Sequence, residues 1–140
     1  MKINKIGLIA VVLIVFVLLG FSLSCKPHQL SYFPVQKDPQ KQLLLLQFGG
    51  ILFIDNDGYL RVKAPKGKDY SPALVIWPYG YSWKIENNKI SIVNEKGQAI
   101  MRVGDTVTLG GGFIPGYFVN EITSFPLPAD AVGPYFEANP

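Results

Sequence analysis

The 140-residue sequence has a single cysteine, Cys25, and a single histidine, His28. Without a second cysteine the chain cannot close an internal disulfide, so packing and hydrogen bonds must hold any folded domain together. Nucleophilic catalysis needs a nucleophile beside an oriented base, and we expect His28, in a polar stretch beside proline, to be solvated instead. We therefore expect a protein that is not an enzyme and that carries no cofactor.

The acidic residues give no sign of paired catalytic carboxylates. They stand singly at expected turns: Asp55, Asp57, Glu95 and Asp105. A carboxylate at a turn usually accepts hydrogen bonds from nearby backbone N–H groups. Asp55 to Gly58 resembles the first half of a calcium loop, but such a loop needs further oxygen ligands and a final bidentate glutamate. Because a strand follows instead, we expect a hairpin turn and no metal.

The chain also lacks an excess of charge of one sign. It has 13 Lys and Arg against 10 Asp and Glu, and two of the basic residues, Lys2 and Lys5, belong to an N-terminal leader. Without residues 1–25, 11 basic and 10 acidic residues remain, so the net charge falls from +3 to +1. This balance offers no basic stripe for a phosphate backbone, and we expect no nucleic acid partner.

Residues 1–25 have the layout of an export signal. Lys2 and Lys5 precede an uncharged apolar run from Ile6 to Leu23, which is followed by Ser24 and Cys25. Basic residues of such segments stay on the cytoplasmic side of the membrane. We therefore expect the rest of the chain to lie on the outer, extracytoplasmic face of a bacterial cell membrane.

The leader could attach the chain in two ways. It resembles a lipoprotein signal, with Cys25 as the lipidation candidate, although Ser22 and Leu23 depart from the usual Leu and small residue before the cysteine. Alternatively, the apolar run would form about 27 Å of helix and could span the membrane uncleaved. Cleavage followed by release is the third alternative.

The remainder divides into three expected parts. Residues 26–41 mix prolines with polar and aromatic residues without a period, which indicates a stalk or linker. Asp38-Pro39 is a helix-start signal that predicts a short helix from Gln40 to Gln47, although Leu43 to Leu46 could equally be a buried strand. We expect a small β-barrel domain over residues 42–112 and an extended, proline-rich tail over residues 113–140.

Signals for β-strands recur at a spacing of roughly ten residues from Gly50 onward. The expected strands are Ile51 to Ile54, Tyr59 to Val62, Ala73 to Trp77, a strand through Trp83 and Ile85, Lys89 to Asn94, Gln98 to Val103, and Thr106 to Leu109. The turns between them predict an all-β, antiparallel meander of about six or seven strands. We expect it to close into a barrel rather than a sandwich, because closure leaves no free edge.

The tail from Phe113 to Pro140 has five prolines and no helical period. Its apolar residues, such as Phe125 and Phe136, would be exposed on a free tail, so we expect it to wrap the barrel in extended form. The preceding Gly110 to Gly112 could cradle an anion if it opened a helix. Because it follows a strand, a flexible corner or a close approach of two backbone segments is the better interpretation.

The segment from Trp77 to Trp83 is unusually aromatic. Its four rings belong to Trp77, Tyr79, Tyr81 and Trp83. They could form a stacking platform for sugar rings, with Lys84, Asn87 and Asn88 as hydrogen-bonding neighbours. The alternative is structural: the two tryptophans fill a small barrel while the tyrosines bridge core and water.

Several segments together form a recognisable pattern: Gly50-x-Leu52, Gly58-Tyr59-Leu60-Arg61, Val75-Ile76-Trp77-Pro78-x-Gly80-Tyr81, Arg102-Val103-Gly104-Asp105, Gly110-Gly111-Gly112 and Gly133-Pro134-Tyr135. The pattern spans residues 50–136 and resembles a small domain that recurs in exported bacterial proteins, often lipoproteins, with no assigned activity. Members of that family often carry cysteine in place of Tyr59 and near Ala131. If those two cysteines form a disulfide in such proteins, the two positions lie close together. The resemblance therefore implies that residues 129–135 pack against the Tyr59 strand.

Together these features predict a membrane-tethered binding or structural module of the bacterial cell envelope. Its expected partners are the membrane and a cell-wall glycan or an envelope protein. Two alternatives stay open. One is glycan or peptidoglycan binding through residues 77–83, and the other is an accessory subunit whose partner enzyme supplies the catalytic groups.

Overall fold

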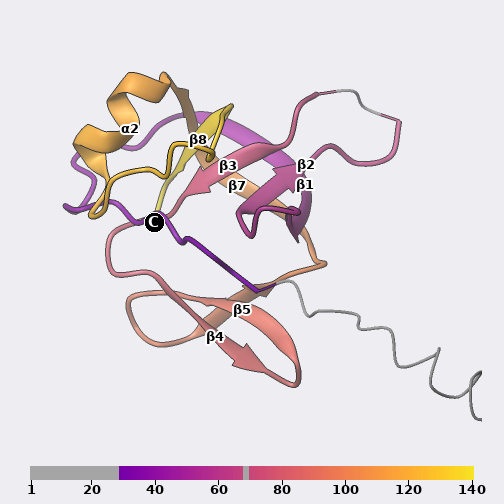
Figure 1. The fold of residues 1–140 in the computed structure, drawn as a ribbon. Coiled ribbons are helices and arrows are strands. Elements are labelled where there is room, and N and C mark those ends of the chain that lie inside the picture. Colours follow the sequence, from indigo (N-terminus) through magenta and orange to yellow (C-terminus); the bar gives the residue numbers. More distant parts are fainter. Residues whose placement is uncertain (1–28, 68–69) are drawn as a thin grey trace, which may run out of the picture.

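The computed structural model describes residues 29–67 and 70–140, which form a β-rich domain with one short helix (Figure 1). Its elements are β1 (Leu46–Ile54), β2 (Leu60–Lys63), β3 (Ala73–Ile76), β4 (Ser82–Glu86), β5 (Lys89–Val93), β6 (Ala99–Arg102), β7 (Thr106–Ile114), α2 (Gly116–Ile122) and β8 (Tyr135–Ala138). Five of the strands close a barrel in the order β1-β2-β3-β8-β7, while β4, β5 and β6 form a separate sheet. The prediction of an all-β barrel is thus confirmed in its outline.

The barrel is not the antiparallel meander that the turn signals predict. Its last strand, β8, lies between β3 and β7, and it runs parallel to β3. The hairpin of β4 and β5 and the adjacent β6 leave the barrel and form the second sheet, seen below the barrel in Figure 1. Local turn chemistry predicts each hairpin, but the pairing of β8 with β3 joins residues far apart in the chain, which local patterns do not specify.

Glycines allow the barrel strands to approach closely. A Cβ on Gly50 would overlap the carbonyl oxygen of Lys63, and one on Gly111 would overlap the carbonyl oxygen of Glu137. Gly111 lies in β7 opposite Ala138 of β8. The interpretation of Gly110 to Gly112 as a place of close backbone approach is therefore confirmed at Gly111.

One apolar core joins the two sheets. Its fully buried members include Leu52 and Leu60 from the barrel hairpin, Phe136 from β8 and Ile92 from the second sheet. A backbone hydrogen bond also joins the turn after β6 to the barrel, because Gly104 N donates to the carbonyl of Leu52 at 2.8 Å. The second sheet is thus packed onto the barrel and is not a free appendage.

The expected stalk is wrong for residues 30–36, which run along the domain. Leu30 is buried, and the ring of Phe33 stacks on that of Trp77 with centroids 5.6 Å apart. Gln36 N donates to the carbonyl of Trp77 at 2.9 Å. An irregular segment that contains proline can be buried as fully as a strand. The absence of a hydrophobic period in its sequence therefore does not predict that it is exposed. We refer to residues 30–41 as the N-terminal arm.

The helix expected from Gln40 to Gln47 is absent. Residues 43–45 have no regular structure, and Leu46 begins β1. Three of the four leucines, Leu43, Leu45 and Leu46, are exposed, so the alternative of a buried strand is also wrong for most of this run. The capping signal at Asp38-Pro39 is overridden because β1 pairs with β7 from Leu46 onward.

The tail of residues 113–140 packs on the domain, but it is not uniformly extended. Phe113 and Ile114 complete β7, Gly116–Ile122 form α2, and Tyr135–Ala138 form β8. The implied packing against the Tyr59 strand is confirmed, because Tyr59 and Ala131 share a buried cluster and the Tyr59 hydroxyl donates to Asp130 Oδ1 at 2.7 Å.

The predictions for residues 1–25, and for Cys25 and His28 in particular, lie outside the described residues. Within residues 29–67 and 70–140, no helix has the length and apolar character needed to cross a membrane.

Candidate ligand-binding site

The four aromatic candidates of residues 77–83 do not share one surface. Trp77 is only 1% exposed and lies in the core, so it is excluded from a platform. Tyr81 packs partly against that core, and burial, together with the nearby Glu95 carboxylate, raises its pKa. Tyr79 and Trp83 are exposed at 48% and 39%. Among the ring pairs of the described residues, none joins two of these four.

The structural alternative for these rings is therefore correct for Trp77 and wrong for Trp83. Trp77 fills core space between the N-terminal arm and the barrel. Trp83 stands instead on β4, the first strand of the second sheet, and does not plug the barrel.

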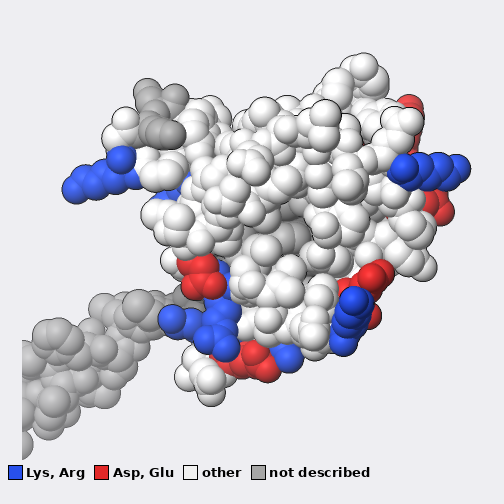
Figure 2. Space-filling model, turned by 180° about the vertical axis from the view of Figure 1, so that it is seen from behind, with Lys and Arg blue, Asp and Glu red and all other residues white. Residues whose placement is uncertain are grey.

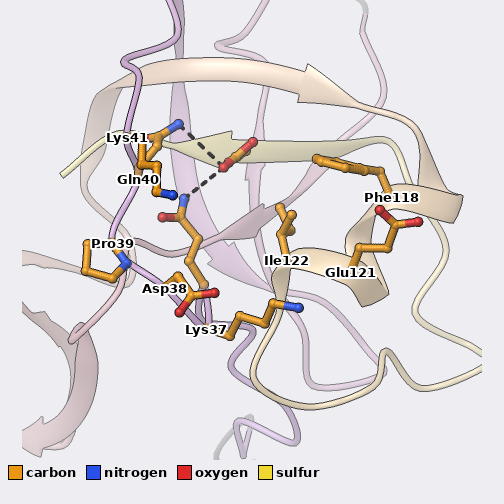
Figure 3. A pocket seen from close by; sticks show the side chains of 10 residues that line it. Lys37, Asp38, Pro39, Gln40, Lys41, Phe118, Glu121 and Ile122 are labelled. Carbon is orange, nitrogen blue, oxygen red and sulfur yellow. Dashed lines mark hydrogen bonds between the residues drawn. The ribbon is translucent and has the colours of Figure 1, made fainter.

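A cleft of about 360 Å³ lies between the N-terminal arm, α2 and β8. Its residues are Gln36, Lys37, Asp38, Pro39, Gln40 and Lys41 from the arm, Phe118, Glu121 and Ile122 from α2, and Glu137 from β8. In Figure 3 the arm residues Pro39, Gln40 and Lys41 stand on one side of the cleft, while Phe118 and Glu121 stand on the other. Small-molecule sites commonly have volumes of roughly 300–1,000 Å³.

The arm forms a fixed wall of this cleft because backbone hydrogen bonds join it to the end of α2. Lys37 N donates to the carbonyl of Ile122 at 2.8 Å, and Ser124 N donates to the carbonyl of Val35 at 2.9 Å. Gln36 is only 3% exposed, and its Nε2 donates to the carbonyl of Ala138 at 3.0 Å. The arm is thus held against β8 and joined to the C-terminal end of α2.

The carboxylate of Glu137 is the central polar group of the cleft. Its Oε1 accepts hydrogen bonds from Gln36 Nε2 at 3.3 Å and from Gln40 Nε2 at 3.4 Å, drawn as dashed lines in Figure 3. Both bonds are long for N–H···O contacts, whose usual length is about 2.9–3.0 Å. Burial raises the pKa of Glu137 because water can no longer fully solvate the ionised form. The carboxylate is therefore shielded but weakly satisfied.

A second acceptor lies beside it. Gln40 Oε1 is buried and has no hydrogen-bond partner among the described residues. A buried acceptor without a donor costs free energy of about 1–3 kcal/mol, which a ligand with an N–H or O–H group would recover. Glu137 and Gln40 together make the cleft a place for hydrogen-bond donors.

The rest of the lining is mixed in character. Lys37 and Lys41 balance Asp38 and Glu121, so ionised Glu137 leaves the lining with one net negative charge. The ring of Phe118, 37% exposed, provides an apolar face. An aromatic face beside amide and carboxylate oxygens suits a neutral ligand that has both hydroxyl groups and apolar C–H faces.

A second polar network, between β2 and the tail, is fully paired. Asp55 accepts the N–H groups of Asp57 and Tyr59 at 3.1 and 2.8 Å, and it forms an ion pair with Arg61. Arg61 also donates to the carbonyl of Val132 at 2.8 Å. The expectation that Asp55 serves a turn is confirmed, and this network helps to hold the tail in place.

The calcium-loop alternative at Asp55 to Gly58 finds no support. Asp55 follows directly after β1, which ends at Ile54, and the segment turns the chain into β2, as a hairpin requires. Within the part of the chain that the structure describes, no three His, Cys, Asp or Glu side chains come close enough to hold a metal ion.

Sequence reasoning missed Glu137, Gln36 and Gln40. Glu137 lies roughly a hundred residues from both glutamines, at separations of 101 and 97. The only local signal is the alternation in Tyr135–Ala138, where buried Phe136 and Ala138 leave Glu137 on the outer face of β8. This alternation is informative only if residues 135–138 are first assigned to a strand, and the sequence predicts an extended tail there instead.

The described residues thus form a small β-barrel domain with a candidate site lined by amide and carboxylate groups. Comparison of the chain with protein-family models, with curated proteins and with solved structures found no match.

Proposed function

We propose that this chain is a binding module tethered to the outer face of a bacterial membrane, and that its cleft binds a saccharide. The observation that carries the proposal is the shielded, weakly satisfied carboxylate of Glu137 beside the unpartnered Gln40 Oε1. Sugar hydroxyls donate to such acceptors, and the C–H face of a sugar ring packs on an aromatic side chain such as Phe118.

The charges of the described residues support a neutral ligand over a nucleic acid. The lining of the cleft is nearly balanced. On the face shown in Figure 2, most of the surface is uncharged, and Lys and Arg lie next to Asp and Glu around its margin. No single-sign field of the kind that attracts phosphate backbones dominates this face.

The tether is proposed from the leader alone. Cys25 as the acylated residue and the apolar run as a spanning helix are the two forms it could take. Labelling cells with a fatty-acid analogue, wild type against Cys25→Ala, separates them. We expect label on the wild type and none on the variant, and an unlabelled wild type that stays in the membrane would favour the helix.

Binding is best tested on the full-length chain in a detergent without a sugar headgroup, by glycan-array screening followed by calorimetric titration of the best ligand. We expect Glu137→Gln to weaken binding at least about tenfold, because a charged acceptor for the hydroxyl groups is lost. Glu121→Gln is the matched control, because this exposed carboxylate at the rim of the cleft accepts no hydrogen bond from a described residue.

The same titration distinguishes the cleft from the aromatic segment. Phe118→Ala should weaken binding, whereas Trp83→Ala should not. If Trp83→Ala abolishes binding and Glu137→Gln does not, the sugar binds at residues 77–83 and the cleft proposal is wrong. A chain that binds no glycan would refute saccharide binding altogether.

A further inference from the structure

The second sheet has an open edge at β4. The strand order is β4-β5-β6, and β4 pairs only with β5. On its other side no strand of the described chain forms a ladder with β4, and no further backbone hydrogen bond reaches residues 82–86. An unpaired strand edge is a template for another strand unless charge, proline or a covering segment protects it.

The backbone of β4 offers hydrogen bonds at this edge. Asn87 and Asn88 have φ angles of 50° and 59° and make a two-residue turn, so Glu86 and Lys89 form the hydrogen-bonded pair that closes the hairpin. Because hydrogen-bonded pairs alternate along a ladder, Ile85 and Ile90 form a non-hydrogen-bonded pair. The carbonyl of Ile90 accordingly faces β6 and accepts Val103 N at 2.9 Å. The N–H and C=O groups of Ile85 therefore point outward.

The side chains of β4 leave the edge partly apolar. Ile85 is 65% exposed and Trp83 is 39% exposed, although both alternate with charged residues. Lys84 and Glu86 stand on the opposite face of the strand, where Lys84 Nζ lies 2.8 Å from Glu86 Oε1. The edge thus combines free backbone groups, exposed apolar side chains and two charges of opposite sign.

We propose that this edge binds a second copy of the same chain. In an antiparallel pair of β4 strands with its two-fold axis at Ile85, the two Ile85 residues form a hydrogen-bonded pair. Lys84 of each copy then lies directly opposite Glu86 of the other. Opposite charges at such cross-strand positions stabilise the pairing, and the two-fold axis makes the favourable contact occur twice.

The charge pattern selects this register over its neighbour. A shift that places the two-fold axis at Lys84 brings the two Lys84 side chains directly opposite each other, which is unfavourable. The Ile85 register also places Ile85 against its counterpart on the apolar face, where both would lose exposure. The result is a six-stranded sheet shared by two barrels.

Charge exchange tests the proposal with the full-length chain in detergent, by sedimentation velocity over a range of protein concentrations. The wild type should show a monomer–dimer equilibrium. Lys84→Glu and Glu86→Lys should each weaken the dimer at least about tenfold, because two attractive pairs become repulsive. The double variant Lys84→Glu/Glu86→Lys should dimerise like the wild type, since its charges are again complementary.

A mixture of the two single variants is the decisive experiment. One variant has two glutamates on β4 and the other has two lysines, so their one-to-one mixture should restore dimers that neither forms alone. Unfolding curves of the single variants should match the wild type, because the exposed ion pair contributes little to stability.

The proposal is overturned if the wild type is monomeric at all concentrations, in which case the edge is left for a strand of another protein. It is also overturned if the single variants dimerise as well as the wild type or if their mixture dimerises no better than either alone.

Discussion

Asp55 and Glu137 are both shielded carboxylates at the barrel, yet their surroundings differ in completeness. Asp55 accepts two backbone N–H groups at 2.8 and 3.1 Å and pairs with Arg61. From the described residues Glu137 accepts only two long amide hydrogen bonds, at 3.3 and 3.4 Å, and it faces a cleft. A saturated carboxylate adds to the stability of the fold, whereas an undersaturated one retains capacity for a ligand. The completeness of the hydrogen bonding thus distinguishes Asp55, which stabilises the fold, from Glu137, for which we propose a role in binding.

The largest effect should come from breaking the saturated network. We expect Arg61→Ala to lower the free energy of unfolding by about 3 kcal/mol, because it leaves the shielded Asp55 without its cation. It also removes the donor to the carbonyl of Val132. Chemical unfolding of the full-length chain measures the change. The exposed Lys66→Ala is the control and should stay within about 0.5 kcal/mol of the wild type. An equal loss in both variants would contradict a structural role for the network.

A smaller loss should follow from Tyr59→Phe, which keeps the ring and removes the hydroxyl that donates to Asp130. Hydrogen bonds to charged groups contribute about 1.5–3 kcal/mol, and we expect a loss near 1.5 kcal/mol. The same unfolding assay applies. Tyr117→Phe, at a residue 79% exposed, should change stability by no more than a few tenths of a kcal/mol. Stability unchanged in Tyr59→Phe would mean that the tail is not held there.

The same tyrosine makes stability sensitive to alkali. Burial and the hydrogen bond to Asp130 raise the pKa of Tyr59 to about 12, from 10.0. The folded state thus prefers the protonated phenol, and this contribution is complete below pH 10 and is lost as the pH rises toward 12. Burial also raises the pKa of Tyr32 and Tyr81. The contribution of Tyr59 to the pH dependence is therefore measured as the difference in unfolding free energy between the wild type and Tyr59→Phe. If the free energies of unfolding of the wild type and of Tyr59→Phe changed in parallel between pH 9 and 12, this assignment would be contradicted.

The smallest effect on stability should come from the unsaturated group. We expect Glu137→Gln to leave stability at pH 7 unchanged or higher, by less than about 1 kcal/mol, because no strong hydrogen bond is lost. Since the pKa of Glu137 is raised, its ionisation costs the folded state stability as the pH rises. The difference from wild type should therefore vanish in acid, where the carboxyl is protonated. A large destabilisation at pH 7 would assign Glu137 to the structural class instead.

The fold was predictable where its signals are local. Asp55 to Gly58 and Asn87-Asn88 indicate tight turns, and both turns close hairpins in the structure. The Leu43 to Leu46 run was ambiguous because neither helical nor strand periodicity fits it, and its conformation depends on β7 and on Asn139, which binds Leu44 through two hydrogen bonds. The burial of Phe33 likewise depends on a distant tryptophan.

The site was less predictable than the fold. The aromatic cluster at residues 77–83 was visible in the sequence, but the fold distributes its rings between core and surface. Glu137 and Gln36 become neighbours only when β8 inserts beside β7 and the arm crosses it. No composition or spacing rule links residues so distant in the chain.

The position of β8 has a consequence for the order in which the chain can fold. The barrel closes only when Tyr135–Ala138 hydrogen-bond to β3 on one side and to β7 on the other. Until then β3 and β7 have open edges, and the cleft lacks Glu137. A chain crossing a membrane with its N-terminus first would remain an open sheet until these residues emerged, so closure of the barrel and completion of the cleft would be one late event.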